Sequence, residues 1–321
     1  MLVTKQGYDM NRATIISLLA VVFLSTCLDA PRDNIYDPKN PDRAYMLATA
    51  YEFGLYPLEG AIVFLTHESE IVRTDTSNDI GEVEFDEIVP GVYGISGEVL
   101  HFSSVSYLPD SIWAGEYITD LRIEFRTLEF EDDIPNTSSP HRFEPIHGIW
   151  AITEDAQHPE AHSTPNVYKG VDSSSNESAI ALCEPEAHKF LIEAKLKVEE
   201  SSGPTWQAGI IFRYQDEYNY CSFTISPETT FCSQVINGQH TYTRIKVHES
   251  TAGTWQCLLV ECHEMYSMMK MYIDDDVIFS LTDNIFTGGK VGLIASDNDQ
   301  PSPVFVNFDD VTLDLTQPYV Q

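Results

Sequence analysis

The chain has 321 residues, of which 43% are hydrophobic, and its 18 basic and 50 acidic residues give a net charge of −32. This length predicts about two domains, with enough apolar material for packed cores. So negative a chain repels nucleic-acid phosphates and anionic lipid headgroups, so we expect no nucleic-acid partner. The charge leaves neutral sugars and cations such as Ca²⁺ as ligand classes, and the alternative is that it only confers solubility.

Residues 1–27 are predicted to be a lipoprotein signal peptide. Arg12 precedes an apolar run, Ala13 to Phe23, that is too short for a comfortable membrane span. The run leads into LSTC, which resembles the bacterial lipobox except that Thr26 stands where Gly, Ala or Ser is usual. The resemblance implies a true start at Met10, cleavage before Cys27 and lipidation of Cys27. A plain secretory peptide or an uncleaved anchor is the alternative.

Residues 28–43 are rich in Pro, Asp and Asn and have no apolar period, so they predict an extended tether. By analogy with enteric sorting, Leu28 after the cysteine favours the outer membrane. We therefore expect a secreted protein, lipid-anchored at the outer membrane or cell surface of a bacterium.

Five cysteines follow Cys27, and this odd number argues against a complete disulfide framework. Cys221 and Cys232 flank a turn and could pair across a hairpin. Two buried free thiols are the alternative.

Residues 44–130 alternate short strand patterns with turn signals, which is typical of a small antiparallel sandwich. In TSNDIGEVEF, Gly81 allows a tight reversal, and Val83 and Phe85 then alternate inward. The run PLEGAIVFL…TSNDIGEVEFDEIVPGVYGISG resembles the carboxypeptidase regulatory-like, or transthyretin-like, domain. The resemblance implies an Ig/transthyretin-like sandwich that acts as a spacer or interaction module. Residues 131–141 lose the apolar pattern and predict a linker.

Residues 142–316 contain at least eight strand patterns and almost no helical period, which predicts a two-sheet jelly roll. A short tail, 317–321, follows. The stretches FLIEAKLKV, AGIIFRYQDEYNYCSFTI, GGKVGLIAS and VNFDDVTL resemble the concanavalin A-like lectin/glucanase superfamily, in particular its laminin-G-like and 3-keto-disaccharide hydrolase-like domains. The predicted fold class is therefore all-β, with a small sandwich followed by a concanavalin A-like jelly roll.

Strict alternation would place Gly209, Ile211 and Arg213 on one sheet face, the one that relatives leave open as a groove. There Arg213 would either pair with a neighbouring acidic or aromatic side chain, or donate hydrogen bonds to sugar hydroxyls. Aromatic rings beside it would complete a sugar-binding face. The predicted ligand-binding residues are Trp206, Arg213, Tyr218, Tyr220 and Tyr242, and three further rings considered are Trp150, Tyr168 and Trp255.

A structural Ca²⁺ is common in such sandwiches, and three carboxylates could supply its oxygen ligands: Glu144, Asp309 and Asp310. Strand-end or surface positions are the alternative for the two aspartates. No catalytic residue is predicted, because the E-x-D-x-x-E spacing of glucanases on this fold is missing, and WQAG replaces the asparagine-serine-glycine usual in the keto-disaccharide hydrolases.

The sequence thus predicts a surface-anchored lipoprotein whose C-terminal jelly roll binds extracellular or cell-wall carbohydrate without catalysis. Two alternatives come from other classes. One is a glycoside hydrolase-like enzyme acting on a (keto-)disaccharide, and the other is a structural or adhesion module with surface protein partners. The predicted partners are a glycan and, through the lipid anchor, a membrane.

Overall fold

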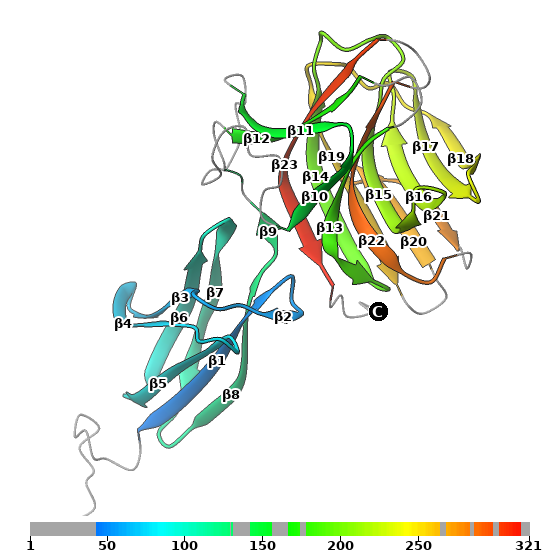
Figure 1. Ribbon diagram of the computed structural model, residues 1–321. Helices are drawn as coiled ribbons and strands as arrows, with labels where there is room; N and C mark the ends of the chain where they lie inside the picture. The colour runs from blue at the N-terminus through cyan, green and yellow to red at the C-terminus, as the bar shows by residue number, and fades with distance from the viewer. Residues whose placement is uncertain are drawn as a thin grey trace, which may run out of the picture.

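The computed structural model describes residues 43–128, 130, 142–155, 166–173, 178–263, 268–282, 286–297 and 302–315. Within these ranges the chain forms 23 strands and no helix, arranged as two sandwiches (Figure 1). The all-β prediction is confirmed. Cys27, residues 28–42 of the predicted tether, the predicted linker 131–141 and the tail 317–321 lie outside the described residues. No described segment forms a helix long and apolar enough to cross a membrane.

The N-terminal sandwich is built from two small sheets. One has β1 at its centre, flanked by β5 and by β8, which runs parallel to β1, with β2 at its end. The other orders its strands β4-β3-β6-β7. Val83 and Phe85 are buried while Glu82 and Glu84 are not, as the alternation predicted. The bounds are β1 Ala44–Glu52, β2 Tyr56–Pro57, β3 Ile62–His67, β4 Glu70–Thr76, β5 Glu82–Ile88, β6 Gly91–Val99, β7 Phe102–Ile112 and β8 Tyr117–Phe125.

The C-terminal sandwich has a seven-stranded sheet on one side, in the order β10-β13-β22-β15-β16-β17-β18. All of its neighbouring strands run antiparallel. β18 forms one edge, and nearly all of its residues are exposed. The bounds are β10 Phe143–His147, β13 Ala179–Ala187, β15 Gln207–Asp216, β16 Asn219–Ile225, β17 Thr229–Ile236, β18 Gln239–Val247 and β22 Gly289–Ser296.

The facing sheet runs β21-β20-β19-β14-β23, and β12 and β11 continue it beyond β23. In β14, Phe190, Ile192 and Ala194 alternate inward, as predicted, and form part of the main core. The bounds are β11 Ile149–Glu154, β12 Asn166–Asp172, β14 Phe190–Val198, β19 Trp255–His263, β20 Met268–Ile273, β21 Asp276–Thr282 and β23 Val304–Asp314.

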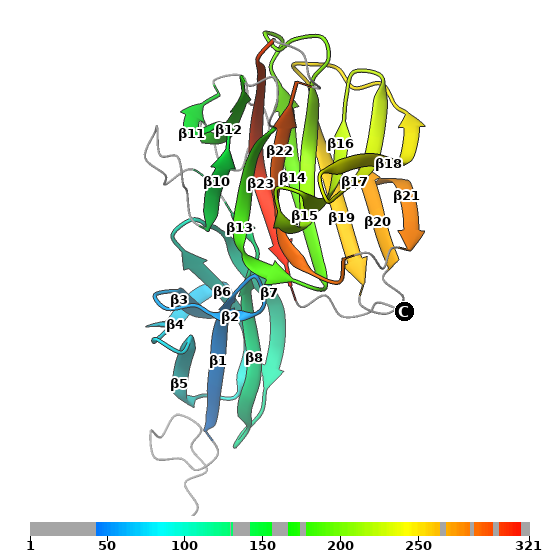
Figure 2. The ribbon, with the colours of Figure 1, turned by 45° about the vertical axis from the view of Figure 1, so that its right-hand side comes forward.

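The two sandwiches are joined by a shared ladder. Strand β9 (Thr127–Leu128) pairs with β7 of the N-terminal sandwich and with β23 of the C-terminal one. Figure 1 shows β9 between the two sandwiches, which Figure 2 shows from a second side. The amide of Leu315 donates to the carbonyl of Phe53 at 3.1 Å, so the last strand also reaches back to the first.

An arginine crosses the same junction. Arg142, just before β10, donates from Nε and Nη2 to the two carboxylate oxygens of Glu52 at 3.0 and 2.9 Å. Glu52 ends β1 and is 1% exposed. A third bond from Nη1 reaches Glu184 on β13 at 3.3 Å. The guanidinium therefore fixes the first strand of one sandwich against the other.

None of the five described cysteines forms a disulfide. Cys221 lies opposite Gln234 in the β16–β17 ladder, whereas Cys232 lies opposite Phe223. The two residues are thus offset along the hairpin, and no disulfide joins them.

Candidate functional site

A β-bulge in β15 decides where the central side chains of the seven-stranded sheet point. The ladder with β16 pairs Phe212 with Cys221 and then Asp216 with Asn219, so three residues face Tyr220 alone. Arg213 takes a positive φ of 53° at this bulge. The extra residues break the period of two that strict alternation assumes.

Because of the bulge, Arg213 points into the core. It is 2% exposed, and its Nη2 donates to the Sγ of Cys262, on β19 of the opposite sheet, at 3.2 Å. Ile211 instead belongs to a separate cluster on the outer face. The prediction that Arg213 shares a face with Gly209 and Ile211 is therefore wrong.

The same bulge brings Tyr214 to the outer face, where it meets Tyr220. Their ring centroids are 6.0 Å apart and the rings are inclined by only 24°. Both rings pack over four buried side chains on the outer face, Ile180, Leu182, Ile211 and Ile294. We call Tyr214 and Tyr220 the tyrosine platform. Tyr220 was predicted, while Tyr214 was missed because regular alternation turns it inward.

The hydroxyls of the platform stay protonated at physiological pH. Burial raises the pKa of Tyr214, and the carboxylates of Glu217 and Asp216 raise it further. Burial also raises the pKa of Tyr220, with a smaller contribution from Tyr214. Each group therefore remains a neutral hydrogen-bond donor up to and beyond its ordinary titration range.

Small side chains lie between the platform's floor and the free edge of the sheet. Ile211 pairs with Ser222, Ser222 with Ser233, and Ser233 with Tyr242, so these four share the outer face. The Ser222 and Ser233 hydroxyls are 2.7 Å apart. Tyr242, 40% exposed, packs its ring against Phe231 with the centroids 4.8 Å apart. The outer face thus carries aromatic rings at both ends of a polar row.

The remaining predicted rings lie elsewhere. Tyr218 is 56% exposed at the tip of the β15–β16 hairpin, where its amide donates to Asp216 Oδ1 at 2.8 Å. Trp206 is buried in the main core just before β15. Trp150 and Tyr168 are also buried and pack together with centroids 4.9 Å apart, while Trp255 receives the Lys197 ammonium 5.2 Å from its ring centre.

A polar cavity of about 320 Å³ adjoins the same hairpin and is lined by Gln215, Asn219, Phe286 and Thr287. Gln215 and Asn219 come from FRYQDEYNY, and Phe286 and Thr287 come from the segment before GGKVGL. The FRYQDEYNY stretch and the residues just before GGKVGL therefore meet at one place. Amides, a hydroxyl and an aromatic ring are groups that recognise neutral polyols.

Two glycines allow these stretches to meet. Gly289 has a φ of 146°, and a Cβ there would lie 2.6 Å from the carbonyl carbon of Arg213. A Cβ on Gly288 would lie 2.4 Å from Nδ1 of His188. Gly289 requires glycine because of its φ and because the groups nearest to it are backbone atoms, whereas a side chain at Gly288 would displace the exposed His188 ring.

The three predicted calcium ligands do not come together. Glu144 lies on β10, whereas Asp309 and Asp310 lie on β23 of the other sheet. Asp310 pairs instead with the Lys195 ammonium at 2.8 Å. No group of three His, Cys, Asp or Glu side chains in the described ranges could hold a metal ion. The residues present do not fit the expected ion.

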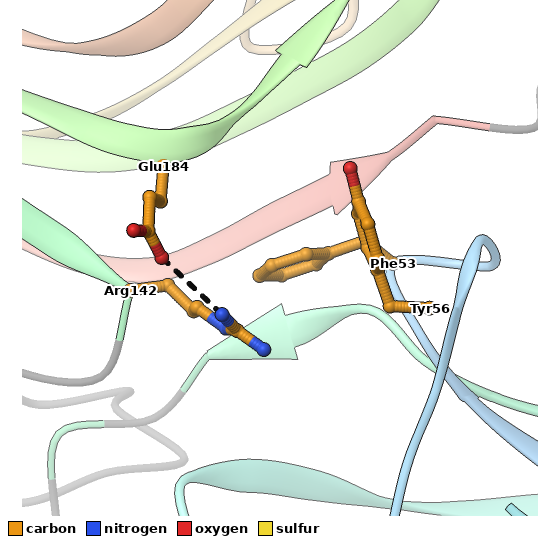
Figure 3. Close-up of a pocket in the computed structure, with 4 residues that line it drawn as sticks. All are labelled: Phe53, Tyr56, Arg142 and Glu184. Atoms are coloured by element: carbon orange, nitrogen blue, oxygen red, sulfur yellow. Dashed lines mark hydrogen bonds and ion pairs between the residues drawn. The ribbon is translucent and has the colours of Figure 1, made fainter. Parts of the chain in front are cut away.

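A smaller cavity of about 190 Å³ lies at the junction of the two sandwiches (Figure 3). Phe53 and Tyr56 line it from the N-terminal side, and Arg142 and Glu184 from the other. Figure 3 shows the Arg142 guanidinium bonded to Glu184. The Glu52 carboxylate accepts hydrogen bonds from Nε and Nη2 of the same guanidinium. Because Arg142 is already bonded to Glu52 and Glu184, we assign this cavity to the packing of the junction and not to ligand binding.

No protein-family model matches the chain, and no curated protein matches it. Several solved structures are similar in fold. A carbohydrate-binding module, CBM66, from Bacillus subtilis is 17% identical over 56% of this chain and 99% of its own, with a TM-score of 0.44. The cellulose-induced protein Cip1 is 13% identical over 61% of this chain and 99% of its own, with a TM-score of 0.42.

An apo Crh5 transglycosylase is 12% identical over 58% of this chain and 89% of its own, with a TM-score of 0.38. All three likenesses are remote in sequence and in superposition. Likenesses this remote carry no activity over to this chain.

Proposed function

We propose that this chain is a surface-anchored lipoprotein whose C-terminal sandwich binds extracellular or cell-wall carbohydrate without catalysis. The observation that carries the proposal is the tyrosine platform, two nearly parallel rings half-buried on the outer face of a sheet. The polarised C–H groups of a sugar ring pack against such π faces, while its hydroxyls reach polar groups at the rim.

The electrostatics of the platform agree with a neutral ligand. Both tyrosine hydroxyls are held in the protonated form. The whole chain carries a charge of −32, which disfavours polyanionic polymers in general. A neutral glycan meets neither a repelling charge nor an ionised tyrosine at this surface.

Noncatalytic binding is supported by the role of Asp216, one of the two carboxylates that act on Tyr214. Asp216 accepts hydrogen bonds from the amide of Tyr218 and from the side chain of Asn219 at 2.8 and 2.9 Å. It is thus occupied in holding the hairpin. Incubating candidate disaccharides with the protein should yield no monosaccharide, and product release would overturn this part of the proposal.

Replacing either platform tyrosine by alanine is expected to weaken glycan binding about fivefold, because each ring contributes roughly 1 kcal/mol of stacking and buried area. The glycan is first identified on an array and binding is then measured by calorimetry. Tyr117→Ala removes an exposed ring on β8 of the other sandwich and is the matched control. Equal binding by the platform variants and the wild type would exclude this surface.

The lipid anchor is proposed from LSTC alone, since Cys27 lies outside the described residues. Mass spectrometry of the protein from a bacterial membrane fraction is expected to find an acylated N-terminal Cys27. Cys27→Ser should release the chain in soluble form, and retention of that variant in the membrane would count against the anchor.

A further inference from the structure

The N-terminal sandwich contains a cavity of about 330 Å³ that the carbohydrate proposal does not use. It lies beside β3, β4 and β6, at the turn that links β5 to β6. Its lining combines two guanidinium groups, Arg43 and Arg73, with the rings of His67 and Tyr93. The rest of the lining is mostly apolar and includes Val72 and Ile88.

Two positive charges in one cavity stand out against the composition of this sandwich. Residues 43–128 contain four arginines and no lysine. Arg122 pairs with Glu124, and Arg126 with Asp314. The other two arginines both line the cavity.

Arg73 has no ion pair or hydrogen bond with any residue in the described ranges, and its side chain is exposed. In a chain with 50 acidic and 18 basic residues, most arginines are expected to form an ion pair with a carboxylate. All N–H donors of the Arg73 guanidinium are therefore available to a ligand.

The opposite wall of the cavity is held in a fixed arrangement. Arg43 Nη1 donates to the carbonyl of Glu87 at 2.6 Å, and the Tyr93 hydroxyl donates to the carbonyl of Val89 at 2.8 Å. The His67 ring lies 5.0 Å from the Tyr93 ring, and its Nδ1 lies 2.9 Å from the carbonyl of Val92. Burial raises the pKa of Tyr93, while Arg43 and Arg73 both act to lower it, so both charges are felt at this hydroxyl.

We propose that this cavity binds the carboxylate group of a small organic acid. Arg73 would engage the carboxylate through paired N–H donors, and the ligand's body would pack on Tyr93 and the apolar lining. A singly charged group is favoured over phosphate, because Glu87 is among the residues that line the cavity and the whole chain is strongly negative.

Saturation-transfer NMR on the full chain tests this with four probes: benzoate, glucuronate, glucose and inorganic phosphate. Benzoate and glucuronate are expected to receive saturation, and their relative strength tells an apolar body from a sugar body. Glucose should receive none at this cavity, and phosphate should not displace either acid at equal concentration. The tyrosine platform could also bind sugars, so the glucose and glucuronate arms are repeated in the Tyr214→Ala/Tyr220→Ala variant.

Arg73→Gln should reduce saturation of the acids about tenfold, since it removes a charge-assisted, bidentate contact. Arg244→Gln, at an exposed arginine on β18, is the matched control and should leave the signal unchanged. Equal signals from Arg73→Gln and wild type would overturn the proposal, as would displacement of both acids by phosphate. Loss of glycan binding in the platform variants would leave this result untouched, so the two proposals fail separately.

Discussion

Replacing Arg142 with leucine is expected to lower the free energy of unfolding by about 3 kcal/mol. The guanidinium donates to both carboxylate oxygens of Glu52, which is 1% exposed. Its own pKa is raised, first through the hydrogen bond to Glu52. Removing it takes two charge-assisted bonds from a carboxylate that water cannot reach. Urea unfolding followed by circular dichroism measures the loss.

The control for this prediction is Arg244→Leu, at an arginine that is exposed on the edge strand β18. A surface arginine contributes little, so this change should cost less than about 0.5 kcal/mol. The double variant Glu52→Gln/Arg142→Leu should be less destabilised than the sum of the two single changes, because the residues form one contact. If Arg142→Leu matches the control, the junction does not depend on this pair.

Residue alternation predicted much of the fold because most strands here bury one face. Val83 and Phe85 in β5, and Phe190 and Ile192 in β14, point inward as their period of two indicates. The partners across the junction were not predictable in this way. The Arg142–Glu52 bond joins residues 90 positions apart, and no local pattern marks it.

The site was predicted less well, and the reason is local. The prediction assumed that side chains alternate without interruption through β15, but the bulge at Arg213 shifts the register. Arg213 points inward and Tyr214 outward. Arg213 is therefore not part of the proposed sugar-binding face, and Tyr214 is. A signal did exist in the sequence. The GG pair before KVGL indicates a close backbone approach, which is where bulges and bends occur.

Replacing Gly289 with alanine is expected to cost about 2 to 3 kcal/mol of unfolding free energy and to weaken glycan binding as well. Its φ of 146° is strained for any residue with a Cβ. That Cβ would lie 2.6 Å from the carbonyl carbon of Arg213 and 2.7 Å from the carbonyl oxygen of Tyr214. Both are backbone atoms, so the bulge itself has to move, and Tyr214 moves with it. Calorimetric unfolding and glycan titration on the same sample measure the two effects.

Gly60→Ala separates steric displacement from backbone strain. Gly60 also has a positive φ, 83°, but nothing lies within 4 Å of a Cβ built there. Its substitution should therefore cost only the conformational term, about 1 kcal/mol, and leave glycan binding intact. If Gly289→Ala lost stability but kept full glycan affinity, the orientation of Tyr214 would not depend on the bulge, and the link between this glycine pair and the platform would fall.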